Sequence, residues 1–424
     1  IWDNCIPTTL RSDELHKLKD VARNLEAIIN PFDIEMRSLD LYTFESGSKS
    51  PLFDVTSKFE QKFVEKKRCS VLNEARQILL KSDYHNTVEI GDEVSKPEDT
   101  LEDDGLSVFR FHKCAVSETA VRILKLCRKT LDETVSIVVE DPEDPIALLP
   151  ATLYKSAREI LDLFRAIIPT TYDREIHEIP RTAGVLHNDA LFLAHACLTL
   201  GIEYKERFPP VSPNDMRGQA LRETCMFVDM VPVFRELADK ALGDMIEKQH
   251  DQLWELAGSR ISLLGQSLRS NESLSEWEDA ETAMNAALYH IRHLSKAWTP
   301  VLSKEVYGRS IGFLLDTIFN LYLEQIFKAD DISENACHFV SAVFRAAMQG
   351  ALELLRGDTE GCQVWDRFSA VGRFADMSIV DINIALSEGV FRSVTGQELS
   401  RLITATFGDS SKRRQLLQAL ASES

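Results

Sequence analysis

The stretch "HNDALFLAHACLTLG", residues 187–201, could be either the ligand set of a metalloenzyme or one buried helix of a helical protein. It holds two histidines, an aspartate and a cysteine among apolar residues. Two histidines on one helix can share a metal ion when they lie about one turn apart. An ideal helix would separate His187 and His195 by about 12 Å along its axis. This spacing excludes a shared ion and predicts a buried helix.

The same stretch carries signals for the ends of a helix. Asn188 or Asp189 fits the N-cap position, and Gly201 fits a C-terminal stop. Between these ends, His195 and Thr199 continue a narrow polar stripe that starts at Asn188. We therefore expect a helix at the centre of a bundle, with His195 hydrogen-bonded to a neighbouring element.

Helical periodicity dominates the rest of the chain, and a single short run resembles a strand. Apolar residues recur at helical spacings in four long segments, which are 55–81, 303–328, 333–355 and 396–421. The run "VSIVV", 135–139, has strand composition, but one strand cannot form a sheet. No strict heptad and no repeat of fixed period persist. The sequence predicts an all-α protein made of consecutive antiparallel helical bundles.

The last of these segments contains its own helix boundaries. Thr395 and Glu398 are spaced as a capping box, in which each side chain bonds the other residue's backbone amide. Gly408 is expected to end that helix, and Asp409 to cap the next one.

Polar and proline-rich segments suggest how the chain is divided. Residues 1–110 should form a first helical part that ends in an acidic mobile loop at 90–105. Residues 111–298 should form a second bundle and residues 299–424 a third, separated by a helix break at Thr299-Pro300. Two shorter breaks are expected at "DPEDP", 141–145, and "FPPVSPNDMRG", 208–218.

Charge and cysteine content exclude several classes of function. The formal net charge is −19, which argues against a basic nucleic-acid surface and against adhesion to anionic membranes. No apolar run approaches the roughly 18 residues of a membrane span, so no direct membrane insertion is expected. The eight cysteines form no C-x-x-C pair, which favours reduced core residues of a cytosolic protein.

Three patterns could carry chemistry, and each has a simpler structural interpretation. His290 and His293 have a spacing that suits a metal, but two ligands do not make a site. Cys337 and His338 are adjacent and so point to different faces of a helix. "GRSIG", 308–312, matches the nucleophile elbow around Ser310, yet no strand precedes it, and its glycines fit close helix packing better. We expect no catalytic residue, cofactor or metal, and keep a helical serine hydrolase at Ser310 only as a remote alternative.

Trp277 is the one candidate docking residue. It lies in the acidic, serine-bearing stretch "NESLSEWEDAE", 271–281, where a large ring could anchor a partner protein. The structural alternative is a capping box of Ser275 and Glu278, with Trp277 in the first turn of a helix that runs to Lys296.

Five stretches in collinear order resemble the carboxy-terminal half of the zeste-white ten family of kinetochore and Dsl-type vesicle-tethering subunits. They are "YHNTVEI" (84–90), "LHNDALFLAHACLTLG" (186–201), "MFVDMVPVFREL" (226–237), "AWTPVLSKEVYGRSIGFLLDTIF" (297–319) followed by "DIS" (331–333), and "LITATFGDSSKRRQLLQAL" (402–420). One feature departs from the yeast relatives, which carry tryptophans in their acidic coat-binding loop. The loop at 90–105 has none, which leaves Trp277 as the only tryptophan in an acidic context.

The resemblance implies an elongated rod of helical bundles that acts as a non-enzymatic scaffold. Such a subunit would serve Golgi-to-endoplasmic-reticulum retrograde transport, in the cytoplasm and peripheral to the endoplasmic-reticulum membrane. Its carboxy-terminal bundles would bind a large helical partner of the NAG or Sec type, with SNAREs and the COPI coat engaged indirectly. The alternative within the family is a kinetochore scaffold with Rod and Zwilch, for dynein recruitment and the spindle checkpoint.

Overall fold

The computed structural model describes residues 24, 51–81, 83–91, 111–137, 148–205, 207, 227–262, 264–269 and 274–423. The chain divides into two compact units, each assembled from segments that are distant in sequence. Unit 1 contains Ile1–Val88, Val116–Asp173 and Asp189–Ala238, and unit 2 contains Glu89–Ala115, Arg174–Asn188 and Asp239–Ser424. The expected division into 1–110, 111–298 and 299–424 stays a prediction.

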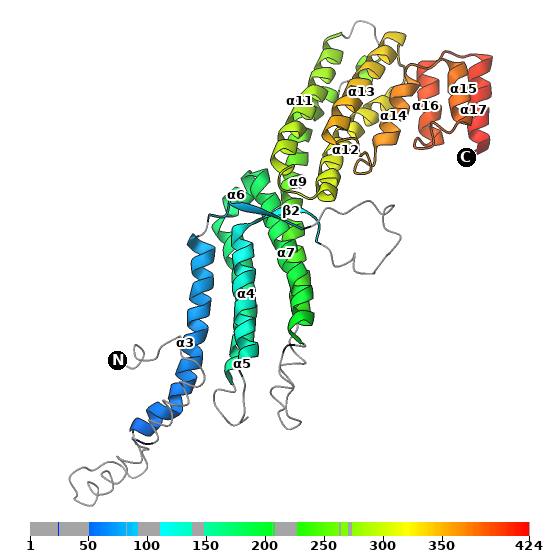
Figure 1. Ribbon diagram of the computed structural model, residues 1–424. Helices are drawn as coiled ribbons and strands as arrows, with labels where there is room; N and C mark the ends of the chain where they lie inside the picture. Colours follow the sequence, from blue (N-terminus) through cyan, green and yellow to red (C-terminus); the bar gives the residue numbers. More distant parts are fainter. Residues whose placement is uncertain are drawn as a thin grey trace, which may run out of the picture. The chain divides into compact units, whose positions relative to one another are not determined.

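Unit 1 is built on three long helices that pack side by side, α3 (Pro51–Lys81), α4 (Glu118–Ser136) and α5 (Leu148–Thr171) (Figure 1). The carboxy-terminal part of α7 (Pro180–Lys205), the short η4 (Val228–Met230) and the start of α9 (Val231–Ile261) belong to the same unit. Apolar stripes on the three helices form its core, with fully buried residues such as Leu79, Ile123, Leu131, Leu161 and Phe164. Burial of these stripes, at about 1.5–3 kcal/mol per large side chain, is what holds the helices together.

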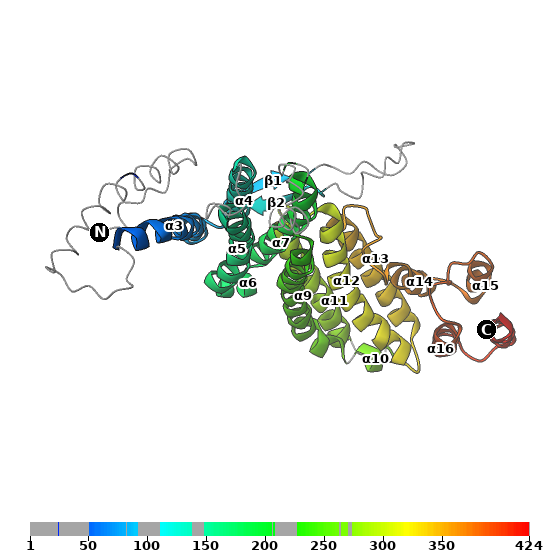
Figure 2. The same ribbon diagram turned by 90° about the horizontal axis from the view of Figure 1, so that it is seen from below.

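Unit 2 contains most of the remaining helices. They are α6 (Asp173–Glu178), α10 (Leu264–Ser267), α11 (Leu274–Trp298), α12 (Lys304–Lys328), α13 (Glu334–Leu354), α14 (Trp365–Phe374), α15 (Ile379–Ser387), α16 (Gly396–Thr406) and α17 (Ser411–Glu423). Figure 2 shows α11, α12 and α13 as neighbouring helices, followed by α14. The rings of Phe319, Phe368 and Phe344 stack in series, with centroids 4.0 and 3.8 Å apart, and join α12, α14 and α13.

The predicted strand at 135–139 is wrong where it can be checked. Val135 and Ser136 are the last residues of α4, and Ile137 is its extended C-cap. Residues 138 and 139 lie outside the described residues. The described part of the chain instead holds one two-stranded sheet, formed by β1 (Thr87–Ile90) and β2 (Cys114–Ser117). Both strands are too short to give a strong alternating pattern, and the all-α class is confirmed.

The predicted long helices correspond to α3, α12, α13 and the pair α16 and α17. The capping box of Thr395 and Glu398 is present at the start of α16. The expected cap of the next helix is wrong by one residue, because the Ser410 hydroxyl, rather than Asp409, accepts the Arg413 amide at 3.2 Å. Asp409 instead pairs with Arg414.

Several predicted loops cannot be compared with the structure. Residues 92–105 of the acidic loop, "DPEDP" at 141–145 and the proline-rich stretch at 208–218 lie outside the described residues. The break at Thr299-Pro300 is confirmed, because α11 ends at Trp298 and α12 begins at Lys304. On both sides of this break the chain is packed within unit 2, where the Trp298 indole donates to the Pro180 carbonyl at 2.9 Å.

The expectation of no span-length apolar segment needs a correction. By length and composition alone, α7 could cross a membrane over Pro180–Tyr204. In the structure 61% of that window is buried inside the protein. This degree of burial is typical of a core helix.

Candidate functional site

Helix α7 is longer than the sequence predicted, and this changes the role of the residues in its middle. The helix begins at Pro180 and continues to Lys205, so Asn188 and Asp189 do not cap its start and Gly201 does not end it. Proline is well tolerated at a first helical position, because its missing amide hydrogen has no intrahelical partner there. The two polar side chains therefore lie in the middle of a buried helix, where each requires a partner.

Asn188 finds its partners in unit 2. Its side-chain amide donates to the carbonyl of Ala115 and to that of Val301, both at 2.8 Å. The Ala115 amide also donates to the Val301 carbonyl at 2.9 Å. One buried side chain thus connects α7, strand β2 and the segment between α11 and α12.

Asp189, the next residue, finds its partners in unit 1. One carboxylate oxygen accepts the Ser117 amide at 2.7 Å, and the other accepts the Ser117 hydroxyl at 2.6 Å. The Ser117 hydroxyl in turn accepts the Ala120 amide at 3.0 Å and caps the start of α4. Asp189 therefore holds the residue at which β2 ends and α4 begins.

Burial raises the pKa of the Asp189 carboxylate well above its ordinary value. Desolvation raises the pKa of Asp189 to about 7, and the bonds from Ser117 lower it only in part. The neighbouring Tyr84 phenol is fully buried, and both burial and the negative charge of Asp189 raise its pKa. The Tyr84 ring also stacks on Tyr172, with centroids 4.8 Å apart.

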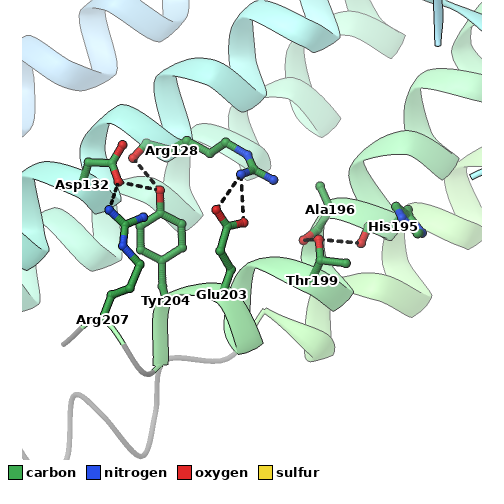
Figure 3. Close-up of polar contacts among 8 residues, drawn as sticks. All are labelled: Arg128, Asp132, His195, Ala196, Thr199, Glu203, Tyr204 and Arg207. Atoms are coloured by element: carbon green, nitrogen blue, oxygen red, sulfur yellow. Dashed lines mark hydrogen bonds and ion pairs between the residues drawn. The ribbon is translucent and has the colours of Figure 1, made fainter. Parts of the chain in front are cut away.

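The other end of α7 carries a polar cluster that attaches it to α4 (Figure 3). Both carboxylate oxygens of Glu203 accept hydrogen bonds from the same nitrogen of Arg128, Nη1, at 2.8 Å. The Tyr204 hydroxyl donates to Asp132 at 2.9 Å, and burial is the main reason that the pKa of Tyr204 rises to about 12. Arg207 pairs with Asp132 and covers the Tyr204 ring.

His195 lies away from this cluster in Figure 3, and burial lowers its pKa. His187 is buried in unit 2, whereas His195 belongs to unit 1. Among the described residues, no group of three or more His, Cys, Asp or Glu side chains could hold a metal ion. The expected hydrogen bond from His195 to a neighbouring element stays a prediction.

The short helix η4 is attached to α5 by a second ion pair. The Arg158 guanidinium contacts both Asp229 oxygens, at 3.0 and 2.5 Å. Phe227 packs edge-on against Tyr154, with ring centroids 5.6 Å apart. Because of the bond from Arg158, the pKa of Asp229 is lowered. Through Phe227 and Asp229, the stretch "FVDM" (227–230) is held against α5 in unit 1. The pairing of Asp229 with Arg158 could not be predicted from the sequence, because the two residues are 71 positions apart.

Of the two glycines around Ser310, Gly312 is used for close packing as predicted, whereas a Cβ atom on Gly308 would meet nothing within 4 Å. A Cβ atom on Gly312 would lie 2.0 Å from the Gly361 carbonyl oxygen, and one on Gly361 would lie 2.3 Å from the Gly308 oxygen. One turn beyond Gly312, Asp316 accepts the amides of Gln363 and Val364 at 3.0 and 2.9 Å. The loop before α14 therefore lies directly on the backbone of α12.

Ser310 itself is a helix residue and not a strained elbow. Its side chain is buried, and its hydroxyl donates to the Val306 carbonyl one turn earlier in α12, at 2.8 Å. No strand precedes it, because α12 is continuous from Lys304 to Lys328. The geometry contradicts the remote hydrolase alternative.

The remaining candidate ligands also have structural partners. His290 bonds Gln249 at 2.8 Å, and its pKa is lowered by burial and then by the nearby His293. The His293 ring packs edge-on against Tyr289. Cys337 is buried, whereas the adjacent His338 is exposed, so the two point to different faces as expected.

Trp277 is packed into unit 2. Its side chain is 6% exposed, its indole donates to the Ser267 carbonyl at 3.3 Å, and its ring stacks on Phe339 with centroids 5.4 Å apart. The expected capping box is wrong, because α11 begins at Leu274 and Ser275 is already inside the helix. Docking by Trp277 stays a prediction, and it would require the ring to leave this packing.

Replacing Trp277 with phenylalanine tests its place in the core. The smaller ring keeps the stacking on Phe339 but removes the donor to Ser267, so we expect a loss of about 1–2 kcal/mol in the free energy of unfolding. Urea unfolding followed by circular dichroism measures this change. Unchanged stability together with lost partner binding would favour a docking role instead.

Comparison with known proteins agrees with the sequence resemblance. Residues 109–255 match the family model "Centromere/kinetochore protein zw10, C-terminal", and residues 282–420 match "ZW10 C-terminal helical domain". A zw10 homologue from Arabidopsis thaliana is 22% identical and covers 96% of this chain and 52% of its own length. One from Mus musculus is 26% identical and covers 77% of this chain and 42% of its own length.

The chain therefore spans about half the length of the curated relatives it matches. Among solved structures, the myosin V cargo binding domain aligns over 85% of this chain with a TM-score of 0.47 and 13% identity. The apo structure of Myo2-GTD gives the same TM-score and identity. The two family models together match more than half of the chain and include helices of both units, and the chain belongs to the zw10 family.

Proposed function

We propose that this chain is a non-enzymatic scaffold subunit of a vesicle-tethering complex for Golgi-to-endoplasmic-reticulum retrograde transport. The observation that carries the proposal is the pair of family matches over residues 109–255 and 282–420. The family is one of non-enzymatic scaffold proteins. The polar residues that could have suggested chemistry, Asp189 and Ser310, are engaged in internal hydrogen bonds, which is consistent with this role.

In this proposal the chain binds a large helical partner subunit through its carboxy-terminal helices. SNAREs and the COPI coat would be reached through that complex and not by direct contact. The protein would act in the cytoplasm, at the surface of the endoplasmic reticulum. Helical bundles suit this work because rigid packed helices can present binding surfaces at fixed separations.

A kinetochore scaffold is the second candidate, because the curated relatives carry the name centromere/kinetochore protein zw10. In that role the chain would assemble with Rod- and Zwilch-type partners. The two candidates share the fold and differ in partner and in timing.

Affinity purification of the tagged full-length protein from interphase and from mitotic cells tests both candidates. Recovery of tethering subunits in interphase, together with delayed retrograde cargo return after depletion, is the expected result. Recovery of kinetochore subunits only, with normal cargo return, would support the alternative.

A further inference from the structure

One face of α9 in unit 2 combines exposed aromatic rings with exposed carboxylates. Trp254 is 51% exposed and packs over Gly258 of the same helix. One turn earlier, the His250 ring lies 6.1 Å from the ring of Phe313 on α12, and Phe313 is 50% exposed. Figure 2 shows α9 along the same bundle as α11 and α12. We call Trp254, His250 and Phe313 the aromatic patch.

An acidic stripe runs beside the aromatic patch. Asp244, Glu247, Asp251 and Glu255 are all exposed. In an ideal helix Glu247 and Asp251 lie within about 60° of Trp254 around the axis. Asp251 contacts the neighbouring His250 ring at 3.2 Å. Within the described part of the chain, the other three carboxylates of the stripe form no ion pair.

The cations nearby neutralise this stripe only in part. Lys248 is held by the His177 carbonyl at 2.8 Å. Lys240 lies one turn before Asp244, and Arg309 lies one turn before Phe313 on α12. Lys248 keeps its positive charge in this bond, so four carboxylates stand beside three cations. The surface around the patch is therefore negative by one charge, and electrostatics favour a positively charged occupant.

We propose that the aromatic patch and the acidic stripe form a docking site for a basic amphipathic segment of a partner protein. An apolar residue of that segment would cover Trp254 and Phe313, which are the large exposed rings of this face. Its Lys or Arg side chains would meet the carboxylates of α9, and an arginine could also stack on the indole face. Half-exposed tryptophans beside charged residues are typical anchors of binding energy at interfaces.

The proposal deepens the scaffold role and rests on it only for the expectation that partner proteins bind. It assigns a chemistry to the partner, which the family matches do not. The aromatic patch lies entirely within unit 2, so the test needs no assumption about unit 1.

A direct test uses the purified 424-residue chain and a fluorescein-labelled helical peptide of about 18 residues, long enough for several turns. The peptide carries leucines at i, i+3, i+4 and i+7, flanked by Lys and Arg. A second peptide carries Glu in place of every Lys and Arg. Fluorescence anisotropy should show binding of the basic peptide alone, weakened by added salt. Trp254→Ala and the double change Glu247→Lys with Asp251→Lys should each weaken binding at least about tenfold.

Matched controls use exposed residues of α11 in the same unit. Tyr289 is 62% exposed, so Tyr289→Ala removes a comparable ring. Glu278→Lys with Asp279→Lys reverses two exposed carboxylates. Neither control should change the affinity for the basic peptide.

Three results of the peptide test would overturn the docking site. They are binding of neither peptide, equal binding of both peptides, and unchanged affinity in Trp254→Ala. Self-association of the wild-type chain that disappears in Trp254→Ala, measured by sedimentation, would assign the patch to a second copy and would also overturn it. Failure of the peptide test leaves the co-purification result of the proposed function unaffected, so the two proposals fail separately.

Discussion

Replacing Gly312 with alanine is expected to lower the free energy of unfolding by about 3 kcal/mol or more, which makes it one of the most damaging single changes in the chain. The added methyl carbon would lie 2.0 Å from the Gly361 oxygen and 2.2 Å from the Gly361 carbonyl carbon. Both are backbone atoms, so the contact cannot be relieved by a side-chain rotation. The loop before α14 would have to leave α12, and Asp316 would lose its bonds to the amides of Gln363 and Val364.

Gly308→Ala, one turn earlier on the same helix, is the matched control. A methyl group there meets nothing within 4 Å. Alanine has a higher helix propensity than glycine, so this variant should gain about 0.5–1 kcal/mol. Urea unfolding followed at 222 nm measures both variants. If Gly312→Ala proved as stable as Gly308→Ala, the close contact between α12 and the loop would be wrong.

The buried carboxylate of Asp189 should make stability depend on pH in a direction opposite to that of most aspartates. Its pKa rises to about 7 in the folded protein from an ordinary value of 3.8, so the folded state holds the proton more tightly than the unfolded state. Stability from this group is therefore fully present below about pH 4, falls as the pH rises toward 7, and is constant above that value. The full change has an upper bound on the order of 4 kcal/mol.

Asp189→Asn isolates this effect, because the amide cannot titrate. The amide oxygen can still accept the Ser117 amide, which preserves one of the two bonds to that residue. The difference in unfolding free energy, wild type minus variant, should decrease between pH 4 and 7 and stay level from pH 7.5 to 9. Urea titrations of both proteins across this range give the difference directly. Parallel pH profiles would mean that Asp189 is ionised and well solvated throughout.

Much of the fold could be predicted from local patterns. The apolar spacing along α12 correctly predicted which residues of that helix are buried. These residues all lie in one long helix, and backbone geometry fixes the period at which they recur on one face. The capping box of Thr395 and Glu398 could also be predicted from the sequence, since both partners lie within four residues. The strands β1 and β2 were missed because each has four residues and is defined by pairing across more than twenty intervening positions.

The candidate site was only partly predictable, and the errors share one cause. Asn188 and Asp189 have the composition of an N-cap, so the sequence placed a helix start there. In the structure they lie eight and nine residues inside α7, because Pro180 begins the helix and distant groups satisfy their side chains. A side chain that can cap a helix can equally bind a remote backbone amide, and local sequence cannot distinguish the two.

By itself the sequence determined the helical class, the positions of α3, α12, α13 and the pair α16 and α17, the spacing that keeps His187 and His195 from sharing a metal ion, and the family resemblance. These properties depend on spacing along one helix or on collinear motifs. Only the tertiary structure decided that Ser117 is the partner of Asp189, that Gly361 lies against Gly312, and that Trp277 is buried while Trp254 is exposed. Each of these depends on which segments meet in space, and that choice is made by the packing of whole helices and not by the residues near any one position.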